Sequence, residues 1–147
     1  MTGAAADVLD GQDALAAYLV RAGYAGRAEE VALRRLAGGQ SNPTYVVTTG
    51  GGQYVLRKQP AGKLLPSAHA IDREFQVMRA LARSEVPVPR MLDHCADGSL
   101  LGTPFYLMDY VQGRSFVDPS LPGLDRAERG AIYAETSRVL AALHELD

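Results

Sequence analysis

The chain has 147 residues and a mass of 15.7 kDa, which is enough for one hydrophobic core or two small lobes. Hydrophobic residues make up 47% and charged residues 22%, a composition that excludes a disordered chain. A net charge of −2 gives no electrostatic attraction for nucleic acid, and no apolar run is long enough to span a membrane. The single cysteine, Cys95, excludes an intrachain disulfide and a cysteine-based zinc site, so we expect a cytoplasmic protein.

The first half of the chain predicts one helix followed by an antiparallel sheet. Apolar residues recur at helical spacing over 15–22, and Gly23 follows as a helix-ending residue. Strands are expected at 31–36, 45–49 and 53–58, with turn-forming residues between them. Both connections are too short to hold a crossover helix, so these strands form a meander rather than a parallel sheet.

The next part predicts a helix and two more strands. The helix is expected over about 67–84, and the strands at 91–95 and 105–110 flank a turn at Asp97-Gly98. The expected fold class is therefore α+β, with a five-stranded antiparallel sheet and one helix inserted after the third strand.

The C-terminal part begins with an internal boundary. Residues 112–124 are rich in Gly, Pro, Asp and Ser, which is typical of a linker. Asp125 and Glu128 form a capping-box pair that opens a final helix. Apolar residues follow on one face of that helix, and this face requires a partner.

Glu74 is a charged residue on the apolar side of the expected helix 67–84. At 100° per residue it falls in the middle of an arc of apolar residues. The members of this arc are Ile71, Phe75, Val77, Met78, Leu81 and Ala82. A carboxylate on a buried stripe needs a cation, because an unpaired buried charge is strongly destabilising. The sequence therefore predicts a cationic partner for Glu74.

Two adjacent cations, Arg57 and Lys58, end the third expected strand and are the candidates for that partner. Strand alternation places Val55 and Arg57 on one face and Lys58 on the other. In protein kinases a V-A-I-K strand puts alanine against adenine and lysine against the phosphates, paired with a glutamate of the next helix. Residues 54–57 fit this register, with Val55 in the alanine position and Arg57 in place of the lysine. We favour Arg57 as the phosphate ligand and keep Lys58 as the alternative.

Two further segments have the composition of a nucleotide site. The Gly-rich turn at 38–42 could place backbone N–H groups over phosphates, although an ordinary hairpin explains the same residues. Residues 105–113 form a strand that leaves through a glycine, the layout of a hinge whose backbone could pair with adenine. The three histidines are scattered, and no spacing of acidic residues predicts a metal site.

Six segments in this order resemble the aminoglycoside phosphotransferase-like kinases, in the branch associated with acyl-CoA dehydrogenases. The segments are GGQSNPTY (38–45), YVLRK (54–58), LLPSAH (64–69), REF (73–75), VPVPR (86–90) and FYLMDYVQGR (105–114). The resemblance covers about residues 30–147 and implies three parts. These are an N-terminal tail and helix (1–27), a kinase-like N-lobe that binds ATP (28–111), and a hinge with the first C-lobe helix (112–147).

The resemblance also implies the site residues. The backbone of Asp109 and Val111 would pair with adenine beside Met108, while Arg57 and Glu74 would take the roles of the kinase lysine and its helix glutamate. The full set of expected nucleotide-binding residues is Gly38, Gly39, Gln40, Ser41, Asn42, Val55, Arg57, Glu74, Met108, Asp109 and Val111. In this family the catalytic His-Gly-Asp segment and the metal-binding Asp lie in the C-lobe, and the 147 residues contain no His-Gly-Asp.

The expected function is that of the ATP-binding lobe of a small-molecule kinase, in a chain truncated before the catalytic loop and its Mg²⁺ ligands. ATP would donate its γ-phosphate to a hydroxyl of an aminoglycoside-like compound, another small alcohol or a hydroxyacyl-CoA. A missing C-lobe or another chain would cover the final helix. The alternatives are a non-catalytic module that binds a nucleotide or a protein, and a truncated reading frame without independent function.

Overall fold

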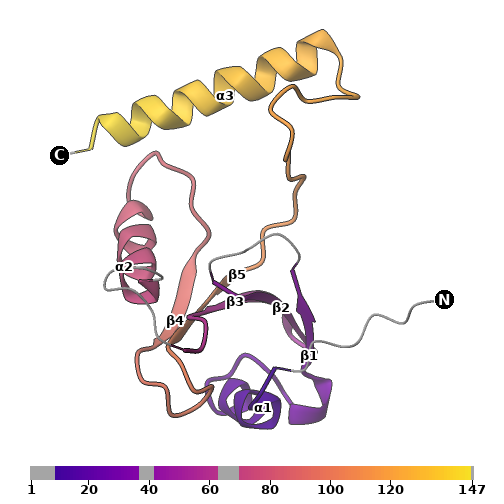
Figure 1. Ribbon diagram of the computed structural model, residues 1–147, viewed down its shortest axis with the longest axis vertical. Coiled ribbons are helices and arrows are strands. Elements are labelled where there is room, and N and C mark those ends of the chain that lie inside the picture. Colours follow the sequence, from indigo (N-terminus) through magenta and orange to yellow (C-terminus); the bar gives the residue numbers. More distant parts are fainter. Residues whose placement is uncertain (1–8, 37–41, 63–69, 147) are drawn as a thin grey trace.

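The computed structural model describes residues 9–36, 42–62 and 70–146. Its centre is a five-stranded antiparallel sheet in the order β1-β2-β3-β5-β4 (Figure 1). The strands are β1 (Ala32–Arg35), β2 (Thr44–Thr49), β3 (Gly52–Lys58), β4 (Met91–Cys95) and β5 (Phe105–Asp109). The predicted fold class, the strand positions and the helix inserted after the third strand are confirmed.

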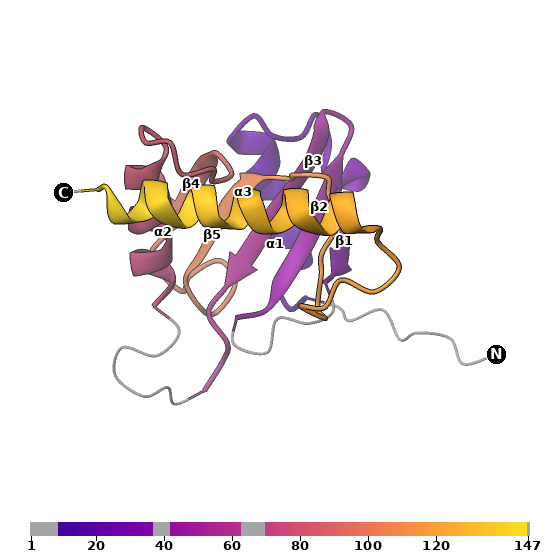
Figure 2. The ribbon, with the colours of Figure 1, turned by 90° about the horizontal axis from the view of Figure 1, so that it is seen from above.

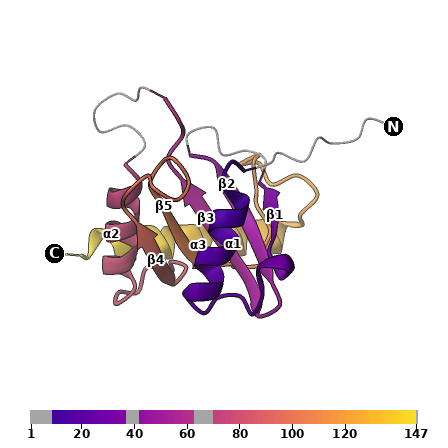
Figure 3. The same cartoon turned by 90° about the horizontal axis from the view of Figure 1, so that it is seen from below.

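One face of the sheet packs on helix α1 (Gln12–Arg21), which crosses the strands in Figure 3. Leu15 and Leu19 of α1 are fully buried and join the same core cluster as Leu56 of β3 and Leu107 of β5. The helix ends as predicted, because Gly23 has a φ of +82° and its N–H bonds to the Val20 carbonyl. Residues of α1 and of the strands therefore share the main hydrophobic core.

The opposite face of the sheet carries helix α2 (Ile71–Leu81), which packs over β4 and β5. Ile71 and Phe75 are buried against Tyr106, and the Phe75 ring stacks on His94 at 4.8 Å. The helix ends before the predicted residue 84. The Ser84 hydroxyl and N–H both donate to the Leu81 carbonyl and close the last turn.

The prediction of a continuous buried stripe on α2 is wrong. Ile71 and Phe75 are buried, but Val77 is 50% exposed and Ala82 is exposed as well. Val77 and Met78 of the predicted arc instead line an open cleft. Glu74 consequently lies at the wall of a cleft and not inside a sealed core.

Helix α3 (Arg126–His144) lies on the other side of the sheet from α1, with its axis running across the strands (Figures 1 and 2). Its predicted capping box is confirmed, since Asp125 and Glu128 bond to each other's backbone N–H. None of its residues is buried, and Leu140 and Leu143 are 51% and 44% exposed. The linker 111–120 that leads to α3 is exposed throughout.

We expect Leu19→Ala to lower the free energy of unfolding by about 2–5 kcal/mol, because it leaves a cavity between α1 and the sheet. Leu140→Ala is the matched control on the exposed face of α3, and it should change stability by about 0.5 kcal/mol or less. Urea denaturation of both variants checks this. Equal small losses would contradict the placement of α1 in the core.

Candidate functional site

A row of polar side chains crosses three strands on the α2 face of the sheet. In the strand register Arg57 of β3 lies opposite Thr44 of β2 on one side and opposite Tyr106 of β5 on the other. Neighbouring strands lie about 4.8 Å apart, so the three side chains are within reach of one another. This row is the base of the candidate site.

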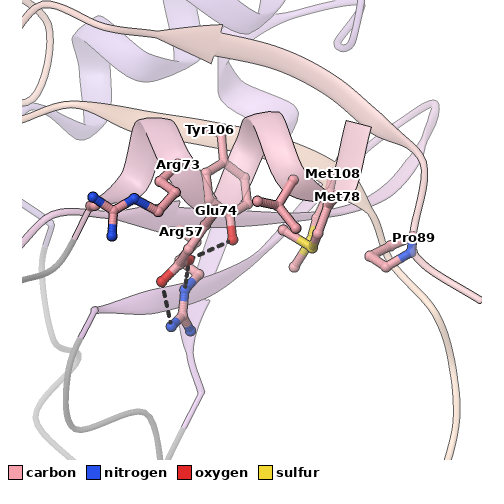
Figure 4. Close-up of a pocket in the computed structure, with 9 residues that line it drawn as sticks. Arg57, Arg73, Glu74, Met78, Pro89, Tyr106 and Met108 are labelled. Carbon is pink, nitrogen blue, oxygen red and sulfur yellow. Dashed lines mark hydrogen bonds and ion pairs between the residues drawn. The ribbon is translucent and has the colours of Figure 1, made fainter. Parts of the chain in front are cut away.

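Glu74 of α2 lies over this row and forms an ion pair with Arg57. Arg57 Nε donates to Glu74 Oε2 at 2.8 Å, and Nη2 donates to Oε1 at 3.4 Å (Figure 4). The predicted pairing of Glu74 with a strand cation is therefore confirmed, and Arg57 is that cation. The two side chains remain 27% and 35% exposed, so solvent weakens this pair relative to a fully buried one.

Two more groups donate hydrogen bonds to the Glu74 carboxylate. Asn42 Nδ2 donates to Oε1 at 2.9 Å, and the Tyr106 hydroxyl donates to Oε2 at 3.0 Å. Both donors are 1% exposed. Such donors stabilise the charged form of a carboxylate, so Glu74 is held by one cation and two neutral groups.

Thr44 links the other side of Arg57 to the backbone. Arg57 Nη1 donates to Thr44 Oγ1 at 3.2 Å, and the Thr44 hydroxyl donates to the Asn42 carbonyl at 3.0 Å. The guanidinium is therefore held from two sides, by Glu74 and by Thr44. Its plane is fixed before any ligand arrives.

The environment of Tyr106 is unfavourable for a phenolate. Burial raises the pKa of the Tyr106 phenol above its ordinary value of 10.0, and the charge of Glu74 and the hydrogen bond to it raise the pKa further. Arg57 acts in the opposite direction and is the smallest cause. Tyr106 is therefore a neutral hydrogen-bond donor at neutral pH.

Lys58 lies on the opposite face of the sheet, as strand alternation predicts. Its side chain is buried, and Nζ donates to the Leu101 carbonyl at 3.0 Å. Burial lowers the pKa of the Lys58 ammonium, while Asp10 acts weakly against this change. Lys58 thus anchors the segment before β5 and does not face the candidate site.

An apolar row lies beside the polar row on the same face. Val55 of β3 is opposite Val46 of β2 and Met108 of β5. A cleft of about 420 Å³ opens here, between the sheet and the connector 87–89. Its wall includes Val55, Met108 and residues 109–111 at the exit of β5. A planar apolar group could occupy this small cleft, with strand-end backbone at its rim.

A larger cleft of about 670 Å³ adjoins the small one and runs between α2 and the sheet (Figure 4). Met108 and Pro89 line both clefts. Its wall includes the charged residues Arg57, Arg73 and Glu74 and the apolar residues Met78 and Val77. The ion pair is therefore accessible from a cavity that is continuous with the apolar row.

The structure brings together seven of the residues expected from the sequence. Arg57, Glu74 and Asn42 are in direct contact, and Val55, Met108, Asp109 and Val111 surround the small cleft. The carboxylate of Asp109 is bonded to Arg90, with Arg90 Nε donating at 3.0 Å. The other expected residues, Gly38, Gly39, Gln40 and Ser41, lie outside the described residues.

Sequence reasoning missed Thr44 and Tyr106. Both belong to the site only because they lie opposite Arg57 in the paired strands. The missing information was the order of the strands in the sheet. β5 lies between β3 and β4 and pairs with both, which brings Tyr106 next to Arg57. A Thr at the start of one strand and a Tyr in another carry no local signal of a shared site.

Within residues 9–36, 42–62 and 70–146, no group of three or more His, Cys, Asp or Glu residues could hold a metal ion. In the same part of the chain, no helix is long and apolar enough to cross a membrane. His94 contacts Asp72 through Nε2 at 2.8 Å and joins β4 to α2.

Comparison with known proteins shows the family to which the chain belongs. The model of the phosphotransferase enzyme family matches residues 32–147, which include all of the described site. The chain belongs to the phosphotransferase enzyme family. Its solved neighbours include the crystal structure of a candidate aminoglycoside phosphotransferase from Ralstonia eutropha JMP134. That structure has a TM-score of 0.74 and 43% identity, and the match covers 91% of this chain and 38% of the other.

Curated relatives of this phosphotransferase-family chain carry the name of a different enzyme class. Mouse acyl-CoA dehydrogenase family member 10 is 51% identical over 136 residues, 92% of this chain and 13% of the relative. Human acyl-CoA dehydrogenase family member 11 is 53% identical over 109 residues, 74% of this chain and 14% of the relative. The chain thus spans about one seventh of the length of these relatives. The predicted resemblance, including its acyl-CoA dehydrogenase branch, is confirmed.

The raised pKa of Tyr106 predicts a dependence of stability on alkaline pH. A phenol with a raised folded-state pKa contributes stability that is complete below about pH 10 and is lost as pH rises further. Tyr106→Phe removes this group, so the free energy of unfolding should fall less steeply above pH 10 in the variant. Chemical denaturation at several pH values checks this. Parallel losses in variant and wild type would contradict the assignment.

Proposed function

We propose that this chain is the ATP-binding lobe of a phosphotransferase that transfers the γ-phosphate of ATP to a hydroxyl group of a small substrate. The observation that carries this proposal is the pair of adjacent rows on one face of the sheet. The apolar row of Val46, Val55 and Met108 suits a purine, and the polar row around Arg57 suits phosphate. Membership in the phosphotransferase family supports the same reaction class.

In this proposal adenine occupies the small cleft. Its faces would contact Val55 and Met108, which line that cleft. The Asp109 carbonyl would accept from the 6-amino group, and the Val111 N–H would donate to N1. Val111 is 69% exposed and borders the cleft, so its backbone is within reach of a ligand there. Backbone groups at a strand exit suit this task because they are held by the sheet.

The phosphates would lie toward Arg57, at the junction of the small and large clefts. Arginine carries a permanent charge and binds phosphate through two parallel N–H groups, so it can replace the lysine of other kinases. The Gly-rich residues Gly38, Gly39, Gln40 and Ser41 remain our proposed backbone donors to the phosphates.

Phosphoryl transfer also needs Mg²⁺ and a residue that positions the attacking hydroxyl. The described residues offer no carboxylate cluster, so we assign them neither the Mg²⁺ ligands nor the base. Their role would be to bind ATP, orient its phosphates and supply positive charge beside them.

The proposed acceptor substrates follow from the names of the related proteins. The solved neighbour is described as a candidate aminoglycoside phosphotransferase, whereas the curated relatives are named as acyl-CoA dehydrogenase family members. The solved neighbour suggests an acceptor hydroxyl on an aminoglycoside-like compound. The curated relatives suggest one on a hydroxyacyl-CoA. Both belong to the class of small-molecule alcohols.

A non-catalytic binding module is the second candidate function, and the surface of α3 favours it. Tyr133, Leu140, Leu143 and Leu146 are between 43% and 53% exposed. An apolar face of this kind is typical of a surface that another protein element covers. Such a module would hold ATP without transferring its phosphate.

ATP binding to the chain tests the leading proposal. We expect Arg57→Ala to weaken ATP binding by about tenfold or more, because it removes a charge-assisted contact to phosphate. Lys58→Ala is the matched control, since its side chain faces the other side of the sheet. It should change the affinity by less than about twofold while lowering stability, because it removes a buried group. Calorimetric titration measures both, and equal or reversed losses of affinity would contradict the proposed site.

The proposed adenine contacts predict selectivity between purines. Guanine presents a carbonyl at position 6 and an N–H at position 1, which reverses the donor and acceptor that Asp109 and Val111 would require. We therefore expect GTP to bind about tenfold or more weakly than ATP, because each mismatched group would lose its hydrogen bond. Competition between the two nucleotides for the same chain checks this, and equal affinities would show that the backbone of 109–111 does not read the base.

A further inference from the structure

Arg57 and three residues around it form a closed ring of hydrogen bonds. Asn42 donates to Glu74, which accepts from Arg57, and Arg57 donates to Thr44. The Thr44 hydroxyl then donates back to the Asn42 carbonyl. The ring joins β2, β3 and α2 to the last residue of the Gly-rich segment 38–42. The ring contains the expected ion pair between Arg57 and Glu74. It adds Asn42 and Thr44, which are not part of the lysine–glutamate pair of kinases.

The ring uses a defined part of the guanidinium. Arginine has five N–H donors, one on Nε and two on each Nη nitrogen. Nε–H and one N–H of Nη2 are directed to Glu74, and one N–H of Nη1 is directed to Thr44. Among the described residues no other acceptor bonds to Arg57. One N–H on each Nη nitrogen therefore remains for a ligand in the large cleft, which Arg57 lines.

We propose that Asn42 and Thr44 are positioning residues that hold Arg57 so that these two remaining N–H groups bind one phosphate of a nucleotide. This inference rests on the proposed ATP-binding function and assigns Asn42 a place behind the ion pair rather than on the ligand. Asn42 fits this role because its side chain is buried and donates to Glu74. Thr44 fits because it holds the side of the guanidinium that Glu74 does not reach.

The ring also explains why arginine can stand at this position. A lysine ammonium has three donors on a single nitrogen and cannot contact Glu74, Thr44 and a ligand from separate corners of a plane. Arg57→Lys would therefore keep the charge and lose the geometry. In this chain the partners Thr44 and Asn42 are matched to a guanidinium.

The experiment compares ATP with adenosine, which lacks the phosphates, on the 147-residue chain. Loss of a hydrogen bond that positions a charged group should weaken ATP binding by about tenfold in Asn42→Ala and in Thr44→Val. Adenosine affinity should change by less than about twofold, because Asn42 does not line the small cleft and Thr44→Val keeps the shape of the Thr44 side chain that does. Thr48→Val is the control on the same face of β2, where the side chain is exposed and bonds only to Gln53 among the described residues. It should change neither affinity.

A double-mutant cycle separates positioning from direct contact. If Asn42 acts through Glu74, Asn42→Ala should cost little further ATP affinity in a Glu74→Ala background. If the Asn42 side chain binds phosphate itself, the two losses multiply and the inference is overturned. Thr44→Val has nearly the same volume as the native residue and keeps the test available if Asn42→Ala does not fold.

The remaining outcomes are distinct. Wild-type chain that binds neither ATP nor adenosine would overturn the proposed function. Wild-type chain that binds ATP, with Asn42→Ala and Thr44→Val binding it equally well, would overturn this inference alone. Equal losses for ATP and adenosine would also overturn it, since they indicate a general structural effect and not the positioning of Arg57.

Discussion

The pairing of Glu74 with Arg57 is the interaction on which the organisation of the site depends. It fastens α2 to β3 in the centre of the sheet, in addition to the packing of the helix on β4 and β5. The carboxylate accepts from Asn42, Arg57 and Tyr106 together, so three separate segments converge on one side chain. Because the pair remains partly exposed, its contribution lies more in geometry than in stability.

The two faces of the sheet differ in packing: one carries the main hydrophobic core, and the other carries the candidate site. The face under α1 contains the main core, and even its cation, Lys58, is buried and bonded to a backbone carbonyl. The other face holds Ile71 and Phe75 against Tyr106 but leaves two adjoining clefts open. The polar row can remain open to solvent because the core on the opposite face of the sheet holds the strands in place.

The exposed α3 and the open clefts fit a chain that spans a small share of its relatives. The family match reaches residue 147, and the solved neighbour is more than twice as long as the matched region. Our proposal therefore gives this chain the task of holding and orienting ATP. The hydrogen-bond ring of Asn42, Thr44, Arg57 and Glu74 adds a reason for a guanidinium at the position where we propose that phosphate binds.

The sequence by itself determined the class of fold, the strands, the face that Arg57 shares with Val55, and the need of Glu74 for a cation. These follow from local periodicity and from the cost of an unpaired charge, which act between near neighbours in the chain. Only the tertiary structure decided that Thr44 and Tyr106 lie on either side of Arg57, and that Asn42 binds Glu74. It also showed that Val77 and Met78 of the apolar arc of α2 border a cleft. Strand order and helix placement depend on contacts between residues far apart in sequence, and the periodicity of a single segment does not show which segments make these contacts.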